Sequence, residues 1–153
     1  MGLARLSENV GRGLAAGVIG TAAMTASSTL EAKLRDRGAS TTPADAARTV
    51  LGIEKFTDDT AEQRFNQLVH WGYGTGWGAV RGLLRTIGLG PRLATFAHLG
   101  AVYGSEQVIL PELDVAPPAT EWGAEEIAVD LLHHVVYALA VAFAYERLAR
   151  RRR

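Results

Sequence analysis

The sequence predicts an all-α fold, namely a four-helix transmembrane bundle of residues 1–153 with a short extra surface helix in the first long loop. Four windows contain no charged side chain, glycines are concentrated in the second window, and the segments between windows differ in the sign of their charge. The charge-free windows are residues 13–30, 65–80, 93–105 and 131–145. A charge at the centre of a bilayer is costly, so windows that approach the roughly 20 residues of a membrane span favour transmembrane helices.

A water-soluble four-helix bundle is the competing fold, and the modest mean hydropathy of +0.06 favours it. The glycines between residues 72 and 82 favour the membrane, because in water each one destabilises a helix by about 1 kcal/mol relative to alanine. In lipid an unsatisfied backbone is more costly than poor helix propensity, so glycine is tolerated and lets helices approach closely. The alternation of glycine with aromatic residues could also describe a strand, but a lone strand would leave an open edge in lipid.

The first long helix is expected over residues 13–35, with Gly17 on a line of small residues along one face. The short helix is expected over 43–51 in the loop that follows. Thr42 before Pro43 is typical of a helix start, and Gly52 is typical of a helix end.

The second long helix is expected over residues 59–87, since three acidic residues near its start would stabilise the positive end of its dipole. Its predicted packing face contains Gly74, Gly78 and Gly82. The third helix is expected over 91–110 and carries the pair Gly100 and Gly104, and the fourth is expected over 121–148. Glycine and proline residues occupy the connections between these helices.

The charges between the windows predict the orientation, because cytoplasmic loops of membrane proteins are enriched in lysine and arginine. The two chain ends and the connection near residue 90 are rich in arginine, whereas residues 111–121 contain three acidic and no basic residues. We therefore expect both termini to lie in the cytoplasm. The loop 31–64 is mixed in charge, but long loops follow the rule poorly.

Ionisable side chains inside the expected helices form the candidate site. They are His70, Glu106, Asp130, His133 and His134. At 1.5 Å of rise per residue, Glu106 lies about 7.5 Å from Pro111, and Asp130 and His134 lie about 12 and 18 Å below Trp122. We expect these groups to meet in the outer half of the bundle, with His98 deeper toward the inside.

Three roles for this cluster remain open. Histidine and carboxylate pairs can join helices as polar contacts worth about 0.5 to 2 kcal/mol each. The cluster could instead handle protons in a proton-linked transporter or a pH sensor, because histidine titrates near neutrality and intramembrane carboxylates mark proton relays. It could also bind a metal or haem, since Asp130 and His133 form an i, i+3 carboxylate–histidine pair that Glu106 and His70 could complete.

Composition and missing motifs exclude several function classes. The chain has no cysteine, which excludes disulfides, zinc ribbons and thiol catalysis, and its sixteen basic and sixteen acidic residues do not indicate a nucleic-acid partner. No nucleophile elbow, Walker loop or dinucleotide fingerprint is present, so we expect a non-enzymatic protein with no cofactor specified by the sequence. The expected partners are the lipid bilayer and either a second copy or another membrane protein. The arginine run at residues 150–153 could hold anionic headgroups or simply flank the last helix.

Three short motifs resemble the YagU-like inner-membrane proteins of bacteria. They are the segment 15–25 (AAGVIGTAAMT), the run 70–74 (HWGYG), and Tyr103-Gly104 with Leu110-Pro111. The resemblance implies an integral protein of the bacterial inner (cytoplasmic) membrane with a helical bundle, and it implies no activity or catalytic residue. The loop 40–59 has no counterpart in this resemblance.

Overall fold

The structure is a computed structural model that describes residues 2–38 and 40–150, and its only regular elements there are helices. This confirms the all-α prediction. The five α-helices are α1 (Leu3–Leu34), α2 (Thr42–Leu51), α3 (Asp59–Thr86), α4 (Pro91–Glu112) and α5 (Ala124–Arg150), and a short 3-10 turn, η1 (Ala119–Glu121), precedes α5. Residues 151–153, which belong to the predicted arginine run, lie outside the described residues.

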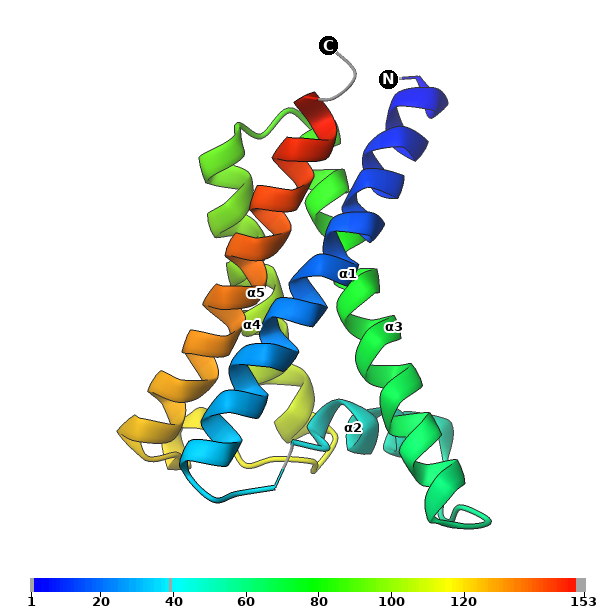
Figure 1. The fold of residues 1–153 in the computed structure, drawn as a ribbon, viewed down its shortest axis with the longest axis vertical. Helices are drawn as coiled ribbons and strands as arrows, with labels where there is room; N and C mark the ends of the chain where they lie inside the picture. The colour runs from blue at the N-terminus through cyan, green and yellow to red at the C-terminus, as the bar shows by residue number, and fades with distance from the viewer. Residues whose placement is uncertain (1, 39, 151–153) are drawn as a thin grey trace.

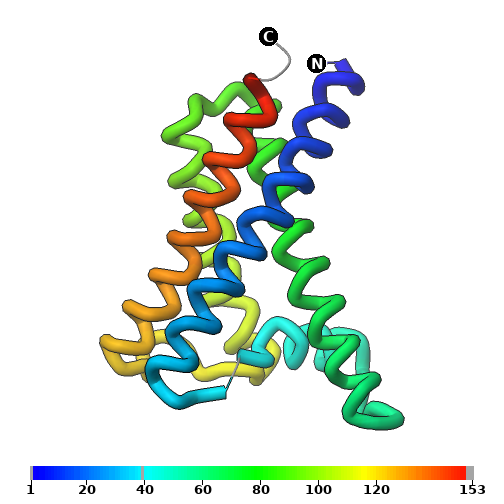
Figure 2. The backbone as a smooth tube through the Cα atoms, in the orientation of Figure 1, coloured from blue at the N-terminus to red at the C-terminus, as the bar shows by residue number. Residues whose placement is uncertain are grey.

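The four long helices lie alongside one another and alternate in direction, and α2 crosses one end of them (Figure 1). We call the end where α1 begins, α3 meets α4 and α5 ends the terminal end. The opposite end, with α2 and the connection from α4 to α5, is the loop end. The backbone tube in Figure 2 shows α3 diverging from α1 and α5 toward the loop end. Helix α1 is the centre of the packing, with α3 and α5 on either side and α4 against α3 and α5.

The seam between α1 and α3 is made of glycine. A Cβ atom added to Gly17 would lie 2.6 Å from the backbone oxygen of Thr75, and added Cβ atoms on Gly13, Gly78 and Gly82 would be closer still to the facing backbone. Glycine at these positions therefore sets the distance between the two helices. Gly100 and Gly104 differ, because an added Cβ on either one would meet nothing within 4 Å. The predicted packing role of this pair is not seen among the described residues.

Helix α1 begins at Leu3, ten residues before the expected start at residue 13. The charge-free window excluded Arg12, yet arginine is a good helix former and Arg12 pairs with Glu8 one turn earlier at 2.7 Å. Asn9 extends the α1–α3 seam in this first part, since its amide donates to the Thr86 hydroxyl at 3.0 Å. Packing against α3 therefore continues the helix beyond the apolar window.

The N-cap residue of α2 is Thr41, whereas Thr42, the expected cap, is the first residue of the helix. The Thr41 side chain makes no capping hydrogen bond to the backbone. The predicted end is confirmed, because Gly52 has φ 66° and ψ 31°, a left-handed conformation that glycine adopts without strain. At the start of α3 the Asp58 carboxylate accepts a hydrogen bond from the Ala61 amide at 2.8 Å, so this helix has a true side-chain cap.

Two helices, α1 and α5, are long and apolar enough to cross a membrane by length and composition. In the described part of the chain α3 and α4 do not meet that measure, so a four-helix transmembrane bundle is not established by hydropathy. The core helix of a water-soluble protein can also be this long and apolar. Whether the four long helices lie in a membrane therefore depends on the polarity of their exposed surfaces.

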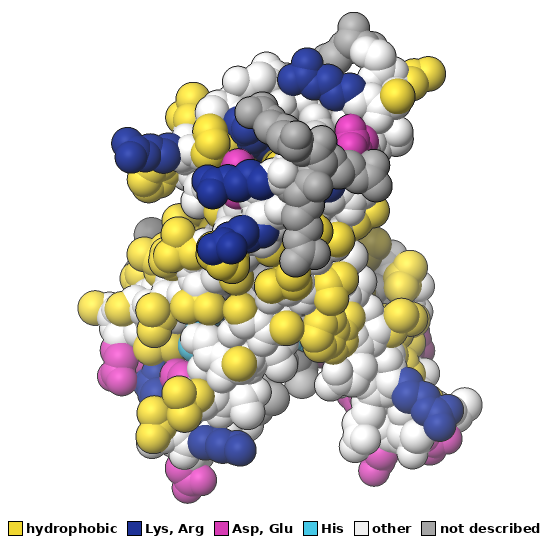
Figure 3. Space-filling view, turned by 45° about the horizontal axis from the view of Figure 1, so that its top comes forward, with side chains coloured by type: hydrophobic (Ala, Val, Ile, Leu, Met, Phe, Trp, Pro, Cys, Tyr) yellow, Lys and Arg dark blue, Asp and Glu magenta, His cyan; other side chains and the backbone are white. Residues whose placement is uncertain are grey.

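The interior of the bundle is unusually polar and its exterior unusually apolar. The buried polar side chains are Asn9, Thr21, Arg81, Thr86, His98, His133 and His134. Most buried apolar residues are alanines, and the larger ones are Val102, Leu110, Tyr137, Val141 and Tyr145. Phe96 and Phe143, by contrast, are 73% and 63% exposed. Figure 3 shows hydrophobic side chains over the middle of one face, arginine and lysine gathered near the terminal end, and acidic side chains mainly at the loop end.

Candidate functional site: a histidine–carboxylate cluster

His134 lies between two carboxylates. Its Nε2 atom is 2.8 Å from Oε2 of Glu106 on α4, and its Nδ1 atom is 3.4 Å from Oδ1 of Asp130 one turn earlier on α5. The same Nδ1 atom lies 2.9 Å from the backbone oxygen of Asp130. These three residues, which we call the His134 cluster, present ligand-type atoms within 4.8 Å of one another.

Helix geometry explains how the cluster is assembled. Asp130 and His134 are four residues apart, so they share a face of α5, and α4 lies against that face. The Tyr103 ring packs against the His134 ring with centroids 5.4 Å apart, which fixes the plane of the imidazole from the α4 side. His134 is buried and the two carboxylates are half-buried.

Two carboxylate oxygens in the His134 cluster lack a hydrogen bond. In the described residues neither Glu106 Oε2 nor Asp130 Oδ2 has a hydrogen-bond partner, although both atoms are buried. The contact of Glu106 with His134 is therefore close in distance but is not aligned as a hydrogen bond. Carboxylate oxygens in this state are poorly solvated and attract a cation.

The remaining two predicted members of the cluster lie elsewhere. His70 on α3 is 2.8 Å from the Thr25 hydroxyl of α1, and no contact joins it to Glu106 among the described residues. The Nδ1 atom of His133 lies 2.9 Å from the Ser27 hydroxyl, and its Nε2 atom is 3.7 Å from Glu31. These two histidines therefore join α1 to its neighbours, which corresponds to the predicted role of polar contacts between helices.

Glu31 at the end of α1 belongs to an ion-pair group at the loop end. The Arg37 guanidinium donates to its carboxylate, and Arg35 pairs with it at 3.3 Å. The hydrogen bond from Arg37, with the positive charges of Arg37 and Arg35, holds the pKa of Glu31 below its ordinary value despite opposition from partial burial. Glu31 is thus anionic at neutral pH.

A second buried ionic group, centred on Arg81, was not predicted from the sequence. Arg81 is fully buried near the terminal end of α3. Its Nη2 atom donates to Glu146 at 3.1 Å and to the Pro91 backbone oxygen at 3.3 Å, and its guanidinium lies over the Tyr145 ring. Sequence spacing contained the signal, because Arg81 follows Gly78 by three residues on the packed face of α3.

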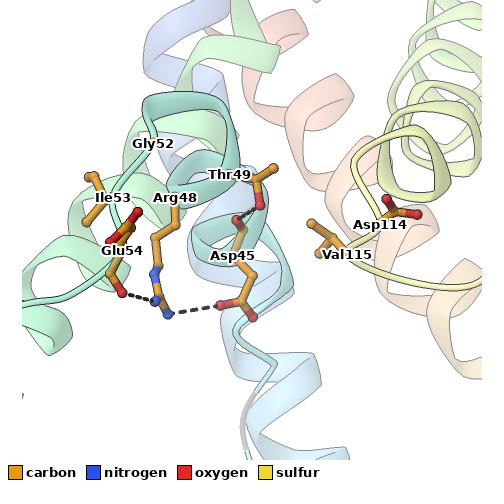
Figure 4. Close-up of a pocket in the computed structure, with 8 residues that line it drawn as sticks. All are labelled: Asp45, Arg48, Thr49, Gly52, Ile53, Glu54, Asp114 and Val115. Carbon is orange, nitrogen blue, oxygen red and sulfur yellow. Dashed lines mark hydrogen bonds and ion pairs between the residues drawn. The ribbon is translucent and has the colours of Figure 1, made fainter.

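A hollow at the loop end is separate from the His134 cluster and shares no residue with it. It has a volume of about 470 Å³ and is open to solvent, between α2 on one side and Asp114 and Val115 on the other (Figure 4). Arg48 crosses its α2 side and pairs with Asp45 at 3.7 Å, and it also donates to the Glu54 backbone oxygen at 3.4 Å. The charges that line the hollow are thus partly paired with one another.

Comparison with known proteins found no family model, no curated protein and no solved structure that matches the chain. The functional argument therefore depends on the site and on the surface of the bundle.

Proposed function

We propose that the chain is a non-enzymatic integral protein of the bacterial inner membrane, in which α1, α3, α4 and α5 all cross the bilayer and both termini are cytoplasmic. The membrane spans in this proposal are the four charge-free windows, each extended by the flanking turns of its helix. The resemblance to YagU-like membrane proteins is part of the same proposal.

The observation that carries the proposal is the inverted polarity of the bundle. Charged and polar side chains such as Arg81, His98 and His134 are buried, while large apolar side chains on all four long helices face outward. The outward-facing set includes Val18, Ile19, Leu68, Trp71, Leu83, Phe96, Val108, Leu132, Leu139 and Phe143. A water-soluble protein buries such side chains, and an extended apolar exterior is stable only against lipid or a partner.

Helix length supports the same placement. The four long helices have 32, 28, 22 and 27 residues, and at about 1.5 Å per residue each exceeds the roughly 30 Å of a bilayer core. Helices α3 and α4 are less apolar than a helix that crosses a membrane alone. Some of their polar side chains face the interior of the bundle and not the lipid. Arg81 and His98 are examples, and neither would meet lipid.

Membrane extraction tests this proposal. The full chain is expressed without a tag, the membranes are washed with alkaline carbonate, and the protein is followed in pellet and supernatant. We expect it to remain in the pellet until detergent is added, because its apolar exterior has no partner in water. Monomeric protein recovered from the soluble fraction without detergent would contradict the proposal.

A further inference from the structure

We propose that Glu106, Asp130 and His134 bind one divalent transition-metal ion inside the bundle. This inference rests on the proposed membrane location, because the low dielectric of that location makes the charge of the site decisive. The three side chains come from two adjacent helices and already present their ligand-type atoms within 4.8 Å.

The hydrogen bonding of His134 leaves one ring nitrogen for the metal. Its Nδ1 atom is 2.9 Å from the Asp130 backbone oxygen, which can only accept, so Nδ1 carries the proton and donates it. In the neutral ring Nε2 then has a lone pair, and this atom faces Glu106 Oε2 at 2.8 Å. Two lone-pair atoms at that distance repel each other unless a cation lies between or beside them. A ring N–H donated to a backbone carbonyl is also the usual way to orient a metal-binding histidine.

The position of Glu106 Oε2 fits a metal ligand better than a hydrogen-bond acceptor. It is within hydrogen-bond distance of Nε2 but not aligned with it, and it has no other partner among the described residues. Two ligand atoms that each lie about 2.1 Å from a metal ion are about 3.0 Å apart at a right angle and about 3.4 Å apart at the tetrahedral angle, so they lie close together without a hydrogen bond between them. Asp130 Oδ2 has no partner either, so it is free to act as the third ligand.

The net charge of the His134 cluster favours a bound divalent ion over protonation of His134. In the described part of the chain no lysine or arginine forms an ion pair with Glu106 or Asp130. Two carboxylates with a protonated His134 have a net charge of −1, whereas two carboxylates with a neutral imidazole and a divalent ion are neutral. An uncompensated charge is costly between membrane helices. One imidazole and two carboxylates suit zinc, manganese, iron(II) or cobalt, and they leave a position open for water or a further ligand.

Metal titration of the purified protein tests the site. Tag-free protein in detergent is stripped with a chelator, and Zn²⁺ and Co²⁺ are added while bound metal, the Co²⁺ absorption spectrum and the melting temperature are measured. We expect one ion per chain, ligand-field bands from Co²⁺ and a higher melting temperature with Zn²⁺. A folded, membrane-extracted protein that binds neither ion would overturn the metal site and leave the proposed membrane function standing.

Variants assign the ligands. His134→Ala, Glu106→Gln and Asp130→Asn should each weaken metal binding by about tenfold or more. His133→Ala is the matched control, because His133 is adjacent, also buried, and contacts Ser27 instead of the carboxylates. Equal metal affinity in His134→Ala and His133→Ala would overturn the assignment. If His134→Ala does not fold, the near-isosteric Glu106→Gln and Asp130→Asn decide, and unchanged affinity in both would likewise overturn it.

Discussion

Arg81 is the residue on which the polar interior at the terminal end depends most. It is fully buried against Glu146 and the Tyr145 ring, and Arg85 also approaches Glu146 at 3.6 Å. We predict that Arg81→Ala destabilises the protein by about 3 to 5 kcal/mol, because it leaves a cavity and removes the nearest partner of Glu146. Thermal melts in detergent measure the effect, with Arg147→Ala as an exposed control. Equal losses in the two variants would show that the buried pair is not stabilising.

Glu31 gives the protein a predicted pH dependence at the loop end. Its pKa lies below the ordinary 4.5 in the folded state, mainly through the hydrogen bond from Arg37, so it stabilises the folded protein above pH 4.5 and stops doing so as the pH falls. We expect Glu31→Gln to melt at a lower temperature than the original protein at pH 7 and the difference to shrink toward pH 3. Melting temperatures across this range test the prediction. A constant difference would mean that Glu31 acts through packing and not through charge.

Residue contacts were predictable from the sequence only as far as helical spacing reaches. The i, i+4 relation of Asp130 and His134 follows from one turn of helix, and the depth of Glu106 places it at a similar height. Depth does not fix the rotation of a helix about its axis. For this reason His70 was expected beside Glu106 but contacts Thr25, and the burial of Arg81 was missed.

At the scale of the element, the α1–α3 seam gives a sharp test. Gly78 has no room for a side chain, since the backbone of Gly13 and Gly17 occupies the place of a Cβ atom. We predict that Gly78→Leu destabilises the protein by about 3 kcal/mol or more, because overpacking must separate the two helices. Gly76→Leu is the control, on the same helix, where an added Cβ meets nothing within 4 Å. Similar melting temperatures for the two variants in detergent would argue against the seam.

The elements themselves were mostly predictable, because glycine, proline and charge mark where helices start and end. The small-residue line on α3 does lie in a close contact with α1. The Gly100 and Gly104 pair shows the limit of such motifs, since identical spacing on α4 faces open space. The early start of α1 was missed because an apolar window records hydropathy, whereas the helix continues as long as Asn9 packs against α3.

At the scale of the whole molecule, the sixteen basic and sixteen acidic residues are distributed unevenly between the two ends of the bundle. Among the described residues, the terminal end has seven arginines and two glutamates. The arginines are Arg5, Arg12, Arg81, Arg85, Arg92, Arg147 and Arg150. The loop end has twelve acidic and six basic side chains in the segments 31–64 and 111–126. An excess of arginine at one end of a membrane bundle favours the cytoplasmic side for that end.

This asymmetry predicts the topology. A reporter that is active only in the cytoplasm should work when fused after Arg150 and fail at Ala116, and a reporter active only outside should give the opposite result. Ala116 suits the insertion because it lies in the connection between α4 and α5, outside any helix. At Lys55 the same pair of reporters should give the same result as at Ala116, on the outer side. Helix α2 and the start of α3 hold this mixed-charge loop at the loop end. Reporters at Ala116 and after Arg150 that work on the same side would exclude a membrane span between them, and with it the four-span bundle, in which α1, α3 and α4 cross before Ala116 and α5 crosses after it.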